Sequence, residues 1–179
     1  LQLTNGPDFG GYAAAADSDD LDLGSPFTVE FWIKHDGTSD ETAYVLNKGT
    51  DRDGIRALLL DGDTEAPRLR VNVGDVDDSR DGITSDRSIP AGRWTHVAVV
   101  DDGTNLSLYL DGQLDGQNND GGGTGSNGNN LVVGANDARN GNFFSGRVDD
   151  LRLWTAARST FEIQQTYRQP LSGSEEGLV

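Results

Sequence analysis

The most regular pattern of hydrophobic and polar positions lies between residues 94 and 110. In the segment 94–100, WTHVAVV, alternate side chains fall on two faces, and in 106–110, LSLYL, the three leucines share one face. A period of two is typical of strands that turn one face toward a core. Asp102-Gly103 separates the two segments, and this pair is favoured in tight turns because glycine accepts a positive φ. The pattern predicts a β-hairpin.

Similar alternation predicts further strands, of which FTVEFWIK, residues 27–34, is the clearest. The others cover residues 44–47, 57–60 and 68–73, the neighbourhood of Ile83, and residues 131–134 and 143–154. One helix is predicted after Ser159, which forms a capping box with Glu162. Its apolar side comes from Phe161, Ile163 and Tyr167, and we expect it to pack across one end of the strand layers.

Two long polar segments interrupt this pattern. Residues 13–26 contain four aspartates but lack the ligand spacing of an EF-hand, and they are interpreted as a solvated acidic loop. Residues 117–130 are rich in glycine and asparagine and are interpreted as a long connection, because strand signals resume directly afterwards.

The amino-acid composition indicates the fold class and the environment in which the protein works. The 179 residues suit one domain, and 24 glycines favour a turn-rich β protein. A net charge of −16 argues against nucleic acid as a partner and suits either a calcium-rich setting or a soluble secreted surface. Cysteine is absent, which excludes disulfides, and no apolar run approaches the roughly 20 residues of a membrane span. Because methionine is also absent, even at residue 1, we expect a module of a longer exported protein, located outside the cell or on its surface.

Seven motifs follow one another in the order found in one family: NGPDFGGY, FTVEFWIK, VLNKG, GRWTHVAVV, LSLYLDGQL, LVVGAND and FSGRVDDLRLW. In this the chain resembles the laminin-G-like and pentraxin-like domains. The resemblance implies an all-β, concanavalin A-like fold: a jelly-roll sandwich of two antiparallel sheets, each of six or seven strands, with one short C-terminal helix. It assigns residues 1–170 to the domain and leaves 171–179 as a tail or linker to a next module.

Catalysis is not expected. Relatives that hydrolyse β-glucans carry a Glu-x-Asp-x-x-Glu pattern on one strand, which this chain lacks, so a glycoside hydrolase is the least supported alternative. The only histidines are His35 and His96, and His96 shares a strand face with Trp94. It is therefore interpreted as a packed strand residue.

Calcium binding is expected from the resemblance, since Ca²⁺ takes six to eight oxygen ligands, often from loops. Asp149 matches an aspartate that holds a structural calcium in related jelly rolls, and Asn5 to Asp8 would complete the site, although many relatives have Asp in place of Asn5. A second site at a sheet rim resembles that of pentraxins and would use Asp51, Asp53, Asn136 and Asp137. The alternatives are a strand-capping role for Asp149 and plain solvated loops.

Sugars are commonly held by an aromatic platform together with planar polar groups. Trp32 and Tyr109 lie on the polar faces of their strands, and the other candidates lie in or near loops: Tyr44, Arg139, Asn140 and Phe143. The alternative for the tryptophans is a place in the core. We therefore expect a non-catalytic, calcium-binding lectin or adhesion module that binds a glycan or cell-surface polysaccharide. The alternative is a structural or protein-binding module in which calcium only stabilises the fold.

Overall fold

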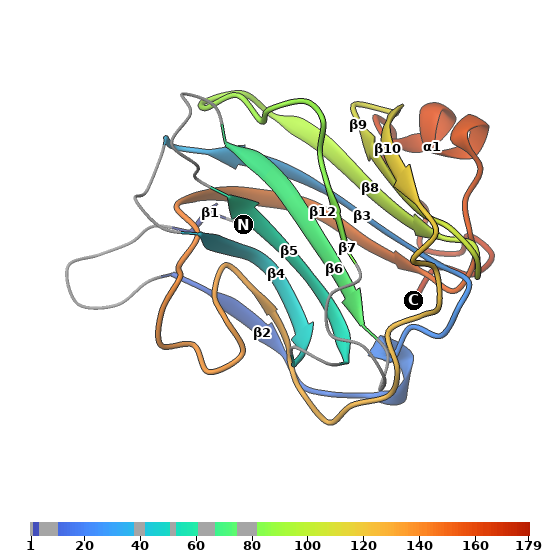
Figure 1. Ribbon diagram of the computed structural model, residues 1–179, viewed down its shortest axis with the longest axis horizontal. Coiled ribbons are helices and arrows are strands. Elements are labelled where there is room, and N and C mark those ends of the chain that lie inside the picture. Colours follow the sequence, from blue (N-terminus) through green and yellow to red (C-terminus); the bar gives the residue numbers. More distant parts are fainter. Residues whose placement is uncertain (1, 4–10, 38–41, 51–52, 61–66, 75–81) are drawn as a thin grey trace.

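Two antiparallel sheets lie face to face and form a sandwich (Figure 1). The computed structural model describes residues 2–3, 11–37, 42–50, 53–60, 67–74 and 82–179. Within these residues sheet I has the order β1 (Gln2–Leu3), β12 (Gly146–Trp154), β3 (Phe27–His35), β8 (Thr95–Asp101), β9 (Leu106–Leu110) and β10 (Gln113–Asn118). Sheet II has the order β2 (Ala13–Ala15), β11 (Leu131–Val133), β4 (Ala43–Gly49), β5 (Gly54–Leu60), β6 (Arg68–Gly74) and β7 (Gly82–Thr84). This is the predicted two-sheet jelly-roll sandwich.

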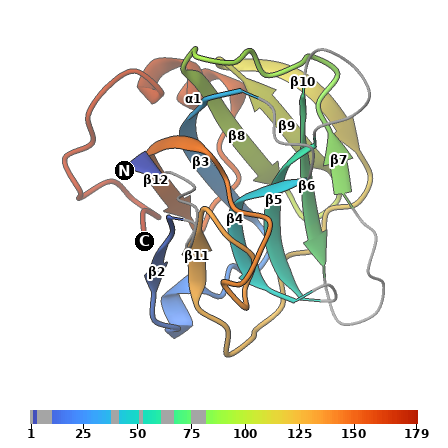
Figure 2. The ribbon, with the colours of Figure 1, turned by 90° about the vertical axis from the view of Figure 1, so that its left-hand side faces the viewer.

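The core lies between the sheets and follows the alternation of the sequence. In β3 the inward residues Phe27, Val29, Phe31 and Ile33 are fully buried and join one cluster with inward residues of both sheets. The predicted hairpin is confirmed, since β8 pairs with β9 from Val97↔Leu110 to Asp101↔Leu106. Figure 2 shows the short strands β2 and β11 on one side of the sandwich and β7 and β10 on the other.

The helix α1 (Thr160–Thr166) lies on the outer face of sheet I rather than across one end of the sandwich (Figure 1). The predicted capping box between Ser159 and Glu162 is confirmed. Of the predicted apolar side only Ile163 is buried, and it packs against the outward side chains of sheet I: Ala98, Val100 and Tyr109. Phe161 is 70% exposed. Small outward residues on β8 give the helix a surface to cover, which explains the difference. Within the described residues no helix is long and apolar enough to cross a membrane.

Three strands were not predicted: the two-residue β1, which pairs with β12, and the strands β10 and β2. After the turn at Asp111 and Gly112, which both have positive φ, the chain continues into β10, so the hairpin becomes a three-stranded meander. The three alanines of β2 pair with β11 at the opposite edge of the other sheet.

The acidic segment before β3 is only partly solvated, in contrast to its interpretation as a solvated loop. The side chain of Lys48 is buried, and its Nζ lies 2.8 Å from an oxygen of Asp17 and 3.0 Å from one of Asp22. The side-chain and backbone oxygens of Asn127, in the glycine-rich connection, each lie 3.0 Å from the same Nζ. One internal ammonium group therefore fastens both polar segments to sheet II.

The last residues contact the end of β12. The Thr155 amide donates to the Gly177 carbonyl at 2.8 Å, and the Val179 amide donates to the Leu153 carbonyl at 2.9 Å. Segment 171–179, predicted as a tail, thus packs on sheet I, and the domain boundary at residue 170 stays a prediction.

Candidate functional site

The outer face of sheet II presents a row of polar and aromatic side chains. Along β5 the side chains of Ile55 and Ala57 point into the core, so Arg56 between them points outward. Arg56 faces Asn47 of β4 in the strand register. Tyr44, half-buried near the start of β4, completes the row. A register shift in β4 between Tyr44 and Leu46, after which both Val45 and Leu46 belong to the core, brings Tyr44 to the same side as Asn47. An aromatic ring, an amide and a guanidinium therefore line one pocket on this face.

The loop between β11 and β12 closes beside this row. Asn136 accepts a hydrogen bond from the Asn140 amide at 3.1 Å and donates to the Asn140 side chain at 3.0 Å, which folds the loop back on itself. Asn142 then fastens it to β4: its carbonyl accepts from the Tyr44 amide at 2.8 Å, and its side chain donates to the Thr42 carbonyl at 2.9 Å. Polar side chains of the loop are thereby held next to Tyr44.

Together the loop and strands enclose a pocket of about 480 Å³. We call it the Tyr44 pocket. Its walls carry one aromatic ring, amides, a guanidinium and a carboxylate, contributed by Tyr44, Asn47, Arg56, Asn136 and Asp137. Such a combination can accept from and donate to several hydroxyl groups while an apolar ring face contacts the phenol.

The Tyr44 pocket unites three of the residues predicted from sequence: Tyr44, Asn136 and Asp137. Asn140 supports it through Asn136, and Phe143 pairs with Tyr44 in a parallel β-bridge. Arg139 belongs to the same loop and has a φ of 56°. Asn47 and Arg56 were not predicted, although the buried neighbours of Arg56 follow a pattern that places it outside.

The remaining predicted residues lie elsewhere. Asn5, Asp8 and Asp51 are outside the described residues. Asp149 and Trp32 face each other across β12 and β3 and line a different pocket, on the outer side of sheet I. Trp32 stacks on Tyr167 at a centroid distance of 5.9 Å and donates to its carbonyl at 3.1 Å. Tyr109 is 8% exposed beneath α1, so it offers little surface to a ligand.

The described residues of the second predicted calcium site, at the sheet rim, could supply only some of the oxygen ligands that the ion needs. Asp137 and Asn136 offer a carboxylate and an amide oxygen at the pocket. Asp53 Oδ1 instead accepts from the Thr50 amide and hydroxyl, each at 2.8 Å. Among the described residues no three His, Asp or Glu side chains are grouped closely enough to hold a metal ion. Most of the six to eight oxygens that Ca²⁺ takes would therefore come from backbone groups and water.

Glu30 is a fully buried carboxylate on β3, and its surroundings are those of a structural ion pair. It is 0% exposed, with Arg158 Nη1 2.6 Å and His96 Nε2 3.2 Å from its oxygens. Burial acts to raise the pKa of Glu30, but interactions with His96 and Arg158 outweigh this and hold the pKa below its usual value. This arrangement keeps Glu30 ionised and inside the protein.

Comparisons with known proteins agree with the fold. The family model of the concanavalin A-like lectin/glucanases superfamily matches residues 7–164. A solved protein from Bacteroides ovatus, to which carbohydrate binding is ascribed, is similar with a TM-score of 0.74 and 19% identity, over 99% of this chain and 50% of that one. This chain thus spans about half the length of that protein. No curated protein matches the chain in sequence.

Two further solved structures are similar over most of their own length. A heptameric pentraxin from Limulus polyphemus has a TM-score of 0.65 and 20% identity, over 94% of this chain and 89% of that one. Domain 4 of an extracellular arabinanase from Geobacillus stearothermophilus, solved with arabinotriose, has a TM-score of 0.60 and 18% identity, over 91% of this chain and 79% of that one. At these identities the structures share the fold, while the family model spans most of the sequence. The chain belongs to the concanavalin A-like lectin/glucanases superfamily.

Proposed function

We propose that this chain is a non-catalytic carbohydrate-binding module of a larger secreted or cell-surface protein, and that the Tyr44 pocket holds the sugar. One observation carries the proposal: an aromatic ring and polar side chains from two strands and their neighbouring loops meet in a single pocket of about 480 Å³. The carbohydrate binding ascribed to the Bacteroides ovatus protein and the arabinotriose bound to the arabinanase domain support it.

The roles follow from the chemistry of the side chains. The Tyr44 ring would contact the C–H face of a sugar, while Asn47 and Arg56 donate to its oxygens and Asp137 accepts from its hydroxyls. Asn136 is held by Asn140, so it would meet the ligand without losing much side-chain freedom. These groups recognise hydroxyl patterns and supply no acid–base pair for hydrolysis.

Calcium is proposed as a second ligand at the rim formed by Asn136 and Asp137. When bound, the ion would bridge loop oxygens and sugar hydroxyls, and it would offset part of the net charge of −16. The pocket can bind sugar without the ion, so the two proposals are tested separately.

The test is calorimetric titration with arabinotriose and with a panel of neutral oligosaccharides, for the native chain, Tyr44→Ala and Tyr12→Ala. Tyr12 is 46% exposed and does not line the pocket, so it controls for loss of a surface tyrosine. Loss of one stacked ring should weaken binding by about tenfold, or about 1.4 kcal/mol. Equal binding by the native chain and Tyr44→Ala would refute the site.

A calcium arm uses the same proteins in calcium and in chelator. If calcium takes part in binding, affinity should fall in chelator, and a ligand that binds the native state should raise the melting temperature. A calcium-dependent rise in melting temperature with no binding to any sugar would instead support a structural or protein-binding module.

A further inference from the structure

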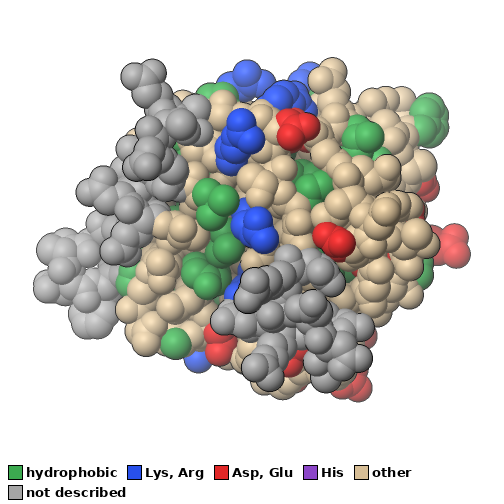
Figure 3. All heavy atoms as spheres, in the orientation of Figure 1, with side chains coloured by type: hydrophobic (Ala, Val, Ile, Leu, Met, Phe, Trp, Pro, Cys, Tyr) green, Lys and Arg blue, Asp and Glu red, His purple; other side chains and the backbone are tan. Residues whose placement is uncertain are grey.

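A second pocket, of about 620 Å³, lies where the two sheets meet at the start of β6. We call it the arginine pocket, because its walls include Arg68, Arg87 and Arg93 together with Asp86, Thr95 and Asp111. Arg68 begins β6 of sheet II, Thr95 begins β8 of sheet I, and the segment 85–94 crosses between the sheets. Figure 3 shows Lys and Arg side chains gathered near the upper edge of the molecule in that view, where this crossing segment runs in Figure 1.

The crossing segment is held firmly in place. Ile89 is fully buried; its amide donates to the Pro67 carbonyl at 2.7 Å, and its carbonyl lies 2.8 Å from His35 Nε2. The buried Asp115 accepts from the Asp86 amide at 2.7 Å and from Arg87 Nε at 2.5 Å. The arginine pocket is therefore preformed, which lowers the entropic cost of binding.

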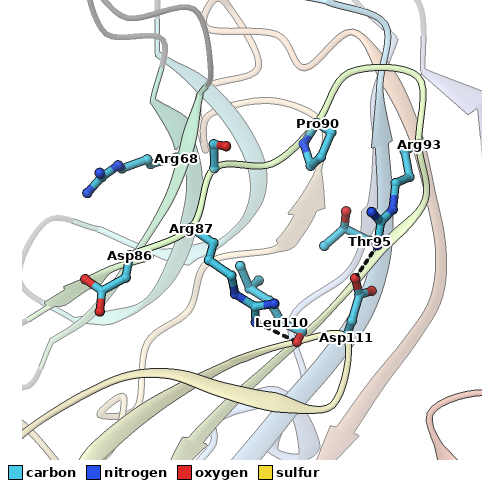
Figure 4. A pocket seen from close by; sticks show the side chains of 9 residues that line it. Arg68, Asp86, Arg87, Pro90, Arg93, Thr95, Leu110 and Asp111 are labelled. Atoms are coloured by element: carbon cyan, nitrogen blue, oxygen red, sulfur yellow. Dashed lines mark hydrogen bonds and ion pairs between the residues drawn. The ribbon is translucent and has the colours of Figure 1, made fainter.

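The three arginines differ in how far their donors are already used. Arg87 is committed to Asp115 and, at 2.9 Å, to the Leu110 carbonyl. Arg93 donates through Nη2 to Asp111 at 2.8 Å and is otherwise 64% exposed. The side chain of Arg68 is exposed and makes no hydrogen bond or ion pair with the described residues. Figure 4 shows Arg87 and Arg93 pointing toward the Leu110–Asp111 turn, while the Arg68 side chain extends away from them, on the side of Asp86.

Thr95 adds a polar group without a partner. Its residue is 3% exposed and lines the pocket, yet its hydroxyl makes no hydrogen bond. Figure 4 places it between the Pro90 segment and Asp111. Buried hydroxyls in native proteins are nearly always satisfied, so one without a partner beside a pocket points to a ligand or water.

We propose that the arginine pocket binds an acidic saccharide, a sugar that carries a carboxylate or a sulfate. Guanidinium groups bind such anions through paired hydrogen bonds, and Arg68 and Arg93 have donors to spare. The carboxylate of Asp86 and the hydroxyl of Thr95 suit the hydroxyl groups of a sugar ring, which an inorganic anion lacks. This proposal rests on its own residues and does not require the Tyr44 pocket.

The long-range field of a chain with net charge −16 opposes an anionic ligand. At physiological ionic strength, however, exposed charges more than about 8 Å apart are largely screened. The arginines that line the pocket therefore act on the ligand at contact distance, whereas most of the other carboxylates do not. Of the two carboxylates in the pocket wall, Asp111 is paired with Arg93, and Asp86 can accept from sugar hydroxyls.

The probes are the trisaccharide of galacturonic acid, its methyl ester, which has the same rings without the charge, and a sulfated galactose trisaccharide. Binding is followed by chemical shifts of the amides of residues 85–96 in the ¹⁵N-labelled chain. The variants are Arg68→Ala and, as a matched control, Arg147→Ala, which removes an exposed arginine of β12 outside the pocket. Thr95→Val tests the unpaired hydroxyl.

We expect the acid to shift these amides and its methyl ester to bind at least about tenfold more weakly, with a similar loss in Arg68→Ala and none in Arg147→Ala. A response to the sulfated sugar as well would define the site as a general anion site for sugars. If the acid shifts none of these amides, or if both arginine variants weaken it equally, the proposal is wrong. Loss of acid binding in Tyr44→Ala with full retention in Arg68→Ala would refute the arginine pocket and leave the Tyr44 pocket standing.

Discussion

Glu30 carries its charge inside the protein, on the outward side of β3 and beneath the C-terminal segment. Its partners come from two directions: His96 from the neighbouring β8 and Arg158 from the chain just before α1. The same guanidinium lies over the ring of Trp154, with Arg158 Cζ 4.1 Å from the ring centroid. The ion pair therefore fastens the C-terminal segment to the face of sheet I.

Replacing Glu30 should reveal this role through its dependence on pH. Because the folded-state pKa of Glu30 is below the ordinary value of 4.5, its contribution is fully present above about pH 4.5 and is lost as the pH falls through the lowered pKa. Glu30→Gln leaves Arg158 buried without its charge partner and should cost about 3–5 kcal/mol at pH 7.

Urea unfolding of Glu30→Gln and the native chain between pH 3 and pH 7 measures this effect. The difference between the two should be largest at neutral pH and should shrink toward pH 3. Glu176→Gln, which changes an exposed carboxylate, serves as the control. A difference that stays constant over this range would show that the charge of Glu30 contributes no stability.

At the scale of elements, β4 and β5 depend on two glycines where they meet. Gly49 and Gly54 face each other with φ of 103° and 99°. A Cβ on Gly54 would lie 1.8 Å from the Lys48 carbonyl oxygen. Only glycine permits the two strands to approach this closely beside the Tyr44 pocket.

Gly54→Ala should therefore destabilise the chain by at least about 3 kcal/mol, since it combines backbone strain with a clash. Gly128→Ala is the matched control, because a Cβ there would meet nothing within 4 Å. It should change the free energy of unfolding by less than about 0.5 kcal/mol. Chemical denaturation distinguishes the two, and equal stability of both variants would contradict the close approach.

The elements that could be predicted are those with apolar alternation. The strands β3, β8 and β9 each bury a regular set of large side chains, and the sequence indicates all three. The buried polar residue of β10 is Asp115, and its partners, the Arg87 guanidinium and the Asp86 amide, both come from a distant segment. Because its buried polar residue depends on such a distant partner, β10 shows no apolar alternation in the sequence. The three alanines of β2 show none either.

Local sequence patterns also decide which of the pocket-lining residues could be predicted. Tyr44 and the Asn136–Asp137 pair could be named because an aromatic residue and polar loop residues suit sugars by type. Arg68, Arg87 and Arg93 are scattered along the sequence, and only the crossing of segment 85–94 between the sheets brings them together. Their convergence is a property of the topology.

At the scale of the whole molecule, 30 acidic residues against 14 Lys and Arg produce a net charge of −16. Self-repulsion of this size opposes the compact state, and added salt screens it. We expect the melting temperature to rise by about 2–4 °C between 10 and 300 mM NaCl, which corresponds to about 1 kcal/mol for a chain of this length.

Differential scanning calorimetry measures this change, with calcium and magnesium chloride at matched ionic strength as further arms. A larger rise in calcium than in either other salt would support a specific calcium site. An unchanged melting temperature in all three salts would show that the surface charge has no effect on stability.

Both ends of the chain attach to the same strand. β1 pairs with the start of β12 at Gly146 and Arg147, and Leu178 pairs with its end at Trp154. Tension between the two ends would therefore run along β12 and load its hydrogen bonds in shear, many at once, rather than peeling them apart one by one. A domain whose two ends are connected in this way resists pulling along the length of β12.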